Sequence, residues 1–425
     1  MRRSVSASRW ATLLLAAAIA MADGASAQTG RVPTAATSAT TAAATRIAVE
    51  SVRIEQDAAR TRLILEFSGT PKPAVFLIAD PPRLIIDIAD VEFRSAVKPP
   101  TGRVGVIEGY RFGLLAPGQS RLVADLGRPA VVDRAELVSV SNGRVALSVA
   151  LVEADEVKFR AAAAASVAPA TPAAPPKAGR GGERTPRPRP LIVLDPGHGG
   201  LDPGAVGKKG VLEKDIVLAV ARQLKMILDG RQRYDLVLTR GSDVFIGLDQ
   251  RVAISEQATA DLFISIHADS LQATDVASTV RGATIYTLSE KASDEQARRL
   301  AEKENAVDIL AGLGGGDREA LDPVRDILID LLRRETSNFS VDFRSLLVRE
   351  LGKSIALSRD PTRSAAFKVL QQTQTPSVLV ELGYMSNTED QALMTTPAWQ
   401  RKVAASIADA IDTFFARRVA GERPR

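Results

Sequence analysis

The sequence contains no cysteine, only two histidines and few aromatic residues, which make up 4% of its 425 residues. The absence of cysteine excludes disulfide bonds, cysteine nucleophiles, thiolate metal sites and a lipid-modified N-terminal cysteine. It does not exclude an oxidising compartment, because a chain of this length can bury a core without disulfide bonds. Any imidazole chemistry must use His198 or His267.

Excess positive charge is confined to two segments. The net charge is +5, but residues 1–27 contribute +2 and residues 161–190 contribute +4. The remaining residues therefore carry a net charge of −1. Because the parts expected to fold are close to neutral, a nucleic-acid-binding surface is disfavoured and no nucleic acid partner is expected.

The first 27 residues have the three parts of a secretory signal peptide. Three arginines precede an apolar run at residues 10–21, and Ala-Ser-Ala at residues 25–27 matches the A-x-A cleavage pattern. The apolar run is too short to cross a hydrocarbon core of roughly 30 Å as a helix. We expect cleavage after about Ala27, export to the periplasm and no transmembrane segment in the mature chain. The route, Sec or Tat, stays open.

The rest of the chain is predicted to form two domains joined by a linker. Residues 28–45 are rich in Ala, Thr and Ser without periodicity, which predicts disorder. Short alternating or β-branched runs separated by Gly, Pro and Asp predict an all-β domain at residues 46–159. Residues 160–190 are rich in Pro, Ala and Arg and predict an extended linker. A second domain follows at residues 191–418, before a short tail at residues 419–425.

A faint internal repeat indicates how the all-β domain is built. Residues 61–68 resemble residues 119–127, since in both an arginine opens a run that ends in an acid, an apolar residue and a small one. The repeat predicts two similar small sheets packed on each other as a sandwich. The domain has no histidine and no acids at ligand spacing, so it is better suited to binding than to catalysis.

The second domain is predicted to be α/β, with a mostly parallel twisted sheet flanked by helices. Its apolar runs read as buried strands at residues 191–194, 235–239, 261–266 and 377–380. Residues 214–228 place apolar side chains at the helical period of 3.6 residues. Strands that alternate with helical crossovers imply a parallel sheet covered on both faces.

Four chemically active side chains follow these predicted elements closely. His198, His267 and Glu381 each come directly after a predicted strand, and Glu213 opens the first helix. The C-terminal ends of parallel strands open onto one edge of a sheet, where ligands bind. We therefore expect these side chains to meet at that edge, although they span more than 180 residues of chain.

Two imidazoles and one carboxylate predict a catalytic zinc site with one Zn²⁺ per chain, because the fourth position stays open for water. Zinc lowers the pKa of that water to roughly 7 and polarises a carbonyl. A further carboxylate must pass the proton to the leaving amine. Glu381 is our candidate for that role and Glu213 for the ligand, although spacing alone allows the exchange. Asp195 or Asp269 is expected to orient an imidazole, and Asp202 only to shape its loop.

Several separate segments resemble the zinc N-acetylmuramoyl-L-alanine amidases of the Amidase_3 family. They are residues 194–200, 213–214, 238–240, 263–269 and 380–387. The match covers nearly all of residues 191–417. The resemblance implies cleavage of the amide bond between N-acetylmuramic acid and L-alanine of peptidoglycan. It also implies that His198, Glu213 and His267 are zinc ligands. Glu381 becomes the catalytic glutamate, which resolves the exchange.

The N-terminal domain resembles the AMIN domain, a β-sandwich, more loosely over residues 46–155. This resemblance implies targeting of the enzyme to the cell wall or the division site. Two alternatives stay open at this point, a zinc peptidase acting on cross-linking peptides and a wall-binding scaffold with an inert zinc site. The presence of all ligands together with the base favours an enzyme over the inert scaffold, whereas the ligand residues alone do not separate the amidase from the peptidase. We expect a monomer.

A long helical insert at about residues 291–360 sets this chain apart from minimal family members. It resembles the insert of the septal cell-separation amidases, whose helix blocks the zinc until a LytM-type activator protein displaces it. We expect Glu304, or alternatively Glu302, to occupy the open zinc position in the resting state. The competing interpretation is that both acids belong to an ordinary solvated helix face.

Overall fold

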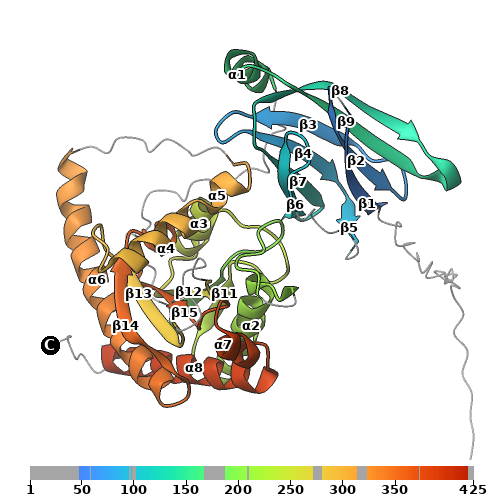
Figure 1. Cartoon of the computed structure of the whole chain (residues 1–425). Coiled ribbons are helices and arrows are strands. Elements are labelled where there is room, and N and C mark those ends of the chain that lie inside the picture. The colour runs from blue at the N-terminus through green and yellow to red at the C-terminus, as the bar shows by residue number, and fades with distance from the viewer. Residues whose placement is uncertain are drawn as a thin grey trace, which may run out of the picture. The chain divides into compact units, whose positions relative to one another are not determined.

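Figure 1 shows the computed structural model of the chain. It describes residues 47–57, 59–94, 97, 102–166, 187–207, 210–270, 280–313, 323–372 and 374–419. The predicted signal peptide, the predicted disordered stretch at residues 28–45 and residues 167–186 of the predicted linker lie outside these ranges. No helix in the described ranges is long and apolar enough to span a membrane.

The N-terminal domain is a sandwich of two antiparallel sheets, as the repeat predicted. One sheet has the order β5-β1-β2-β9-β8 and the other β3-β4-β7-β6. The elements are β1 Ile47–Gln56, β2 Thr61–Phe67, β3 Pro73–Ile78, β4 Arg83–Ala89, β5 Val91–Phe93, β6 Ile107–Ala116, β7 Gln119–Leu126, β8 Ala130–Ser139, η1 Ser141–Gly143 and β9 Val145–Glu153. The short β5 alone runs parallel to its neighbour β1. The two repeats correspond to β2 and β7, one from each sheet, and both contribute to one buried cluster.

The linker begins later than the predicted boundary at residue 160. Helix α1, Glu156–Ala165, continues through the alanine run and is capped at its N-terminus by Asp155. Phe159 is fully buried in the core of the sandwich, and two of the alanines pack against the same core. The prediction was wrong here because alanine is the strongest helix former and because Phe159 gives the helix an apolar anchor.

The second domain contains a six-stranded sheet with the order β11-β10-β12-β15-β13-β14. The strands are β10 Leu191–Pro196, β11 Asp235–Leu238, β12 Leu262–His267, β13 Ala283–Leu288, β14 Leu357–Ala365 and β15 Ser377–Glu381. The first four in spatial order are parallel, whereas β13 is antiparallel to β15 and parallel to β14. The mostly parallel sheet is therefore confirmed.

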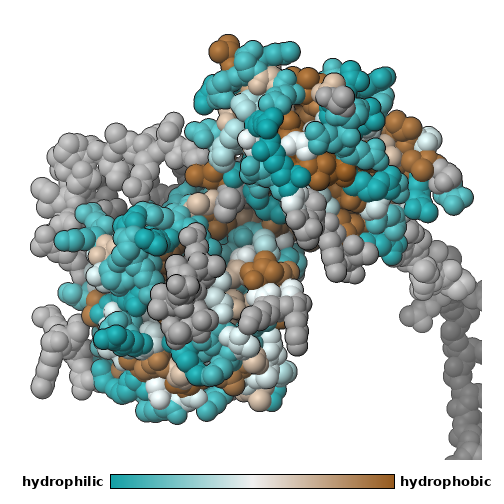
Figure 2. Space-filling model, in the orientation of Figure 1, coloured by the Kyte–Doolittle hydropathy of each residue, from teal (hydrophilic) through white to brown (hydrophobic). Residues whose placement is uncertain are grey.

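Helices cover both faces of this sheet. They are α2 Glu213–Arg231, α3 Leu248–Ala258, α4 Glu295–Asn305, α5 Val307–Leu310, α6 Pro323–Gly352, η3 Lys368–Leu370, α7 Thr388–Met394 and α8 Pro397–Val419. Side chains of α2, α6 and α8 share one buried cluster with one face of the central strands. Side chains of α3, α4 and η3 share another cluster with the opposite face. Figure 2 shows hydrophilic residues over much of the visible surface of this domain.

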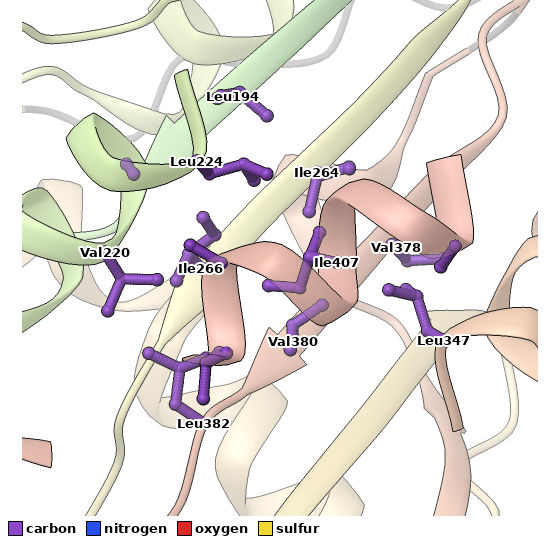
Figure 3. Close-up of a cluster of buried hydrophobic side chains, with 14 of the residues drawn as sticks. Leu194, Val220, Leu224, Ile264, Ile266, Leu347, Val378, Val380, Leu382 and Ile407 are labelled. Atoms are coloured by element: carbon purple, nitrogen blue, oxygen red, sulfur yellow. The ribbon is translucent and has the colours of Figure 1, made fainter. Parts of the chain in front are cut away.

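Alternate residues of adjacent strands build the larger core. Ile264 and Ile266 of β12 lie beside Val378 and Val380 of β15, and Ile407 of α8 packs over them (Figure 3). All of them are fully buried. Successive strand residues point to opposite faces, so each strand contributes to the clusters on both sides of the sheet.

Shortening Ile264 to alanine is expected to lower the free energy of unfolding by about 2–5 kcal/mol, because it leaves a cavity in a packed core. Denaturant unfolding followed by circular dichroism measures this change. Met226→Ala on α2 is the control, since Met226 is 61% exposed and surface changes cost less than about 0.5 kcal/mol. Equal losses in the two variants would contradict the position of Ile264 in the core.

The insert predicted at about residues 291–360 is largely helical, as expected. It contains α4, the short α5 and the 30-residue α6. Phe343 and Leu347 in the second half of α6 are buried in the core beside α8. The insert therefore ends in a helix that is also a structural part of the domain.

Candidate metal centre

Three adjacent strands bring the predicted site residues to one edge of the sheet. His267 is the last residue of β12 and Glu381 the last of β15, and the two are paired in register. His198 lies in the loop after β10, and Glu213 is the first residue of α2. All four side chains are buried. The parallel order β10-β12-β15 thus gathers residues that are far apart in the sequence.

One ring nitrogen of each histidine faces the same carboxylate oxygen. His198 Nε2 lies 3.1 Å from Glu213 Oε1, and His267 Nδ1 lies 3.3 Å from the same atom. The two rings meet edge to face with their centroids 4.9 Å apart. Neither nitrogen makes a hydrogen bond of regular geometry within the described residues. Buried polar atoms rarely lack a partner, so this arrangement fits a bound metal ion.

Glu304 of α4 reaches the same place. Its Oε2 lies 3.6 Å from His198 Nε2 and 3.5 Å from His267 Nδ1. One potential ligand atom from each of these three residues lies within 4.8 Å of the others. Glu302 points elsewhere, because its side chain is 61% exposed and pairs with Arg298. Of the two acids named from the sequence, only Glu304 is beside the site.

Backbone amides hold the carboxylate of Glu213. Its Oε2 accepts a hydrogen bond from the N–H of Ala205 at 2.8 Å. Its Oε1 accepts one from the N–H of Ala268, the residue after His267, at 2.7 Å. The carboxylate is therefore fixed between the loop before α2 and the end of β12.

Two glycines leave room for the ligand side chains. A Cβ at Gly204 would lie 2.7 Å from both Glu213 Oε2 and the His198 ring, and this glycine has a φ of +66°. A Cβ at Gly197 would lie 2.4 Å from the ring of His267. These glycines are needed for close approach, and any larger residue would displace one of these side chains.

Asp202 orients His198, a role that we did not predict from the sequence. Its Oδ2 lies 2.7 Å from His198 Nδ1, which leaves Nε2 to face the site. The two carboxylates predicted to orient an imidazole make other contacts instead. Asp195 accepts hydrogen bonds from two hydroxyl groups and an arginine, and Asp269 pairs with a lysine. The spacing of four residues between His198 and Asp202 was the only available signal.

The site concentrates negative charge. Burial alone would lower the pKa of His198, but the carboxylates of Asp202, Glu213 and Glu304 raise it well above its usual value. Burial and the neighbouring carboxylates also raise the pKa of Glu381 well above its usual range. Crowded buried carboxylates are stable only beside positive charge, so the surroundings favour a cation here.

Glu381 lies at the same edge with one free oxygen. Its Oε2 accepts a hydrogen bond from the backbone N–H of Asp269 at 2.9 Å. Its Oε1 is buried and has no hydrogen-bond partner among the residues that the structure describes. One carboxylate oxygen is thus held in place while the other is available to accept a proton.

Polar contacts fasten the C-terminal end of α4 over the site. The ammonium group of Lys303 pairs with Asp269 and lies 3.5 Å from Glu304 Oε1. Asn305 donates to the carbonyl of Ala366 at 2.8 Å and accepts from the N–H of Lys368 at 2.7 Å. These contacts join segments about 35 and 60 residues apart, so they could not be predicted from sequence patterns.

Comparison with known proteins identifies the family. The profile described as N-acetylmuramoyl-L-alanine amidase matches residues 192–413, and that of the AMIN domain matches residues 51–133. The chain belongs to the N-acetylmuramoyl-L-alanine amidase family. Both resemblances inferred from the sequence are thereby confirmed.

Individual relatives agree with the family. The N-acetylmuramoyl-L-alanine amidase AmiC of Escherichia coli O6:H1 is 32% identical over 387 residues, which cover 87% of this chain and 89% of that protein. AmiA of Salmonella typhimurium is 39% identical over 226 residues, 53% of this chain and 76% of that protein. The solved catalytic domain of CwlV from Bacillus (Paenibacillus) polymyxa aligns at 28% identity with a TM-score of 0.38, covering 53% of this chain and 98% of that structure.

Family membership establishes the reaction class. The chain is an N-acetylmuramoyl-L-alanine amidase, a hydrolase that acts on peptidoglycan at the bond between N-acetylmuramic acid and L-alanine. This result decides against the zinc peptidase that the ligand residues alone had left open. The described part of the amidase also contains a His-His-Glu cluster able to bind a metal.

Proposed function

We propose that this amidase is a zinc enzyme that holds one Zn²⁺ per chain through His198, Glu213 and His267. The observation that carries the proposal is the convergence of two buried imidazole nitrogens on one carboxylate oxygen. Two histidines and one glutamate are a known ligand set of catalytic zinc sites. When bound, zinc supplies a Lewis acid that polarises the scissile carbonyl and lowers the pKa of a water molecule.

In this proposal Glu381 is the catalytic residue that moves the proton. Its free Oε1 accepts a proton from the attacking water and returns it to the leaving amine of L-alanine. The hydrogen bond from Asp269 keeps the other oxygen in place. Asp202 accepts a hydrogen bond from the Nδ1–H group of His198, so that Nε2 carries the lone pair a metal ligand needs.

We also propose that Glu304 keeps the amidase inactive at rest. Its carboxylate lies within 3.6 Å of both ligand nitrogens, where the carbonyl of a substrate would have to approach. The contacts of Lys303 and Asn305 hold α4 in this position. Hydrolysis then requires α4 to move, and a LytM-type activator protein is the proposed agent.

The proposed place of action is the periplasm, where a monomeric enzyme would remodel peptidoglycan during daughter-cell separation. The secretory pattern of residues 1–27 supports export. The AMIN domain supports attachment to the wall, since it has the sandwich architecture and no group of side chains in its described residues that could hold a metal ion.

Metal removal is expected to abolish hydrolysis, and added Zn²⁺ is expected to restore it. The mature chain, residues 28–425, is analysed for bound metal and then incubated with purified peptidoglycan before and after treatment with a chelator. New amino groups of L-alanine report the reaction. The same series with Glu304→Gln keeps the test informative if the parent is inactive at rest. Activity that survives complete metal removal, or a purified chain that cannot bind zinc, would exclude the proposed mechanism.

A further inference from the structure

The loop that carries His198 has a strained backbone. His198, Gly199 and Gly200 have φ values of +57°, +123° and +58°. Glycine adopts such angles freely, but a histidine in the left-handed region stays there only where its surroundings hold it. Two of its backbone N–H groups have backbone partners, since Gly197 donates to the carbonyl of Ile266 at 3.0 Å and Gly199 to that of Asp202 at 2.9 Å.

Arg251 of α3 binds two carbonyl groups of this loop. Its guanidinium group donates to the carbonyl of Pro196 at 2.8 Å and to that of His198 at 2.7 Å. The side chain is only 2% exposed. A buried guanidinium thus reaches the carbonyl of the ligand residue itself, while the His198 ring faces the site.

Arg240 binds the carbonyl between these two and joins the loop to α2. It donates to the carbonyls of Pro196 at 2.9 Å and Gly197 at 2.7 Å. The same side chain donates to the carbonyl of Lys214 at 2.9 Å, directly after Glu213. Arg240 therefore connects the backbone beside one proposed ligand to the backbone beside another.

A buried carboxylate balances the positive charge of Arg251. Asp195 accepts from Arg251 at 2.6 Å through Oδ1, which also accepts from the hydroxyl of Thr239 at 2.6 Å. Its Oδ2 accepts from the hydroxyl of Ser265 at 2.7 Å. Burying a guanidinium group is costly unless such a partner is present. The two arginines, Asp195 and the loop carbonyls form one hydrogen-bonded unit beneath the metal centre.

We infer that Arg251 and Arg240 are positioning residues that hold His198 and Glu213 in place for the metal. They act through the carbonyls of Pro196, Gly197, His198 and Lys214. The inference rests on the proposed metal site and assigns no contact with the reacting atoms. Arginine is required because its planar fork presents five N–H groups in fixed directions, whereas a lysine ammonium cannot reach the same acceptors together.

Conservative variants of the mature chain test this role. Arg251→Lys and Arg240→Lys keep the positive charge but lose the planar guanidinium group. Each is expected to weaken zinc binding about 10–100-fold, because the loss of a hydrogen-bonding group that orients a metal ligand usually has an effect of this size. Zinc affinity is measured by competition with a chromophoric chelator. The visible absorption of the Co²⁺-substituted protein reports ligand geometry and is expected to change. Arg231→Lys is the matched control, because Arg231 pairs with Asp409 and Asp412 on another part of the domain.

The possible results distinguish a failure of this inference from a failure of the proposed metal site on which it rests. A folded Arg251→Lys variant with the zinc affinity and Co²⁺ spectrum of the parent would overturn the inference. If circular dichroism shows that this variant is unfolded, Arg240→Lys decides by the same two measurements. A parent chain that binds no zinc would overturn the proposed metal centre instead.

Discussion

Replacing Glu304 by glutamine is expected to raise the rate of peptidoglycan hydrolysis without an activator by at least about tenfold. Glutamine has the same size but no charge, so it competes poorly for a metal held by His198 and His267. If the substitution weakens the contact of residue 304 with the metal site by about 1.4 kcal/mol, the fraction of molecules in which the site is not blocked rises tenfold. Release of soluble fragments from dye-labelled peptidoglycan measures the basal rate.

Glu302→Gln is the matched control for this experiment. Glu302 is in the same helix, carries the same charge and is exposed beside Arg298. Its replacement is expected to leave the basal rate unchanged. If Glu304→Gln stays as inactive as the parent while it binds zinc normally, Glu304 does not block the site, and the inhibition has another cause or is absent.

Glu381→Gln is expected to lower hydrolysis by about 10²–10⁴-fold, the usual contribution of a positioned acid–base group. The amide group of glutamine still accepts the hydrogen bond from Asp269, but it cannot take a proton from water. The rate is best compared in the Glu304→Gln background, where the basal activity of the reference is higher. The zinc content is expected to remain one per chain.

This variant also distinguishes the two carboxylates whose roles the sequence spacing could not separate. If Glu381→Gln loses zinc together with activity, Glu381 is a ligand and the roles of Glu381 and Glu213 must be exchanged. Glu389→Gln serves as the control, because Glu389 is an exposed residue in the first turn of α7. Its activity and zinc content are expected to match those of the reference.

The position of the site could be predicted because buried strands can be recognised from local patterns. Short apolar runs before His198, His267 and Glu381 identify buried strands, and parallel strands end at one edge. The sequence therefore located the site without any knowledge of distances. It could not distinguish Glu213 from Glu381, since that choice depends on which carboxylate oxygen lies 3.1–3.3 Å from the ring nitrogens.

Contacts between segments far apart in the sequence could not be predicted from sequence patterns. Arg251 looks like an ordinary helix residue in the sequence. Arg240 belongs to the segment 238–240 that resembles the amidase family, but nothing in that pattern shows that both side chains are buried against the loop after β10. Asp202 was missed because the left-handed backbone of His198 decides where its ring points. The extent of α1 was missed because the anchoring of Phe159 depends on the assembled sandwich.

The register of the central strands determines the distance between two residues of the site. Since His267 and Glu381 are paired across β12 and β15, their separation is determined by the spacing of adjacent strands, close to 4.8 Å, rather than by any loop. The helical insert leaves the sheet after β13 and returns at β14, outside the strands that carry the proposed ligands. The parts of this segment outside the buried clusters can change in length or sequence while the distances among the reacting groups stay constant. The proposed control of this enzyme can therefore evolve separately from its catalysis.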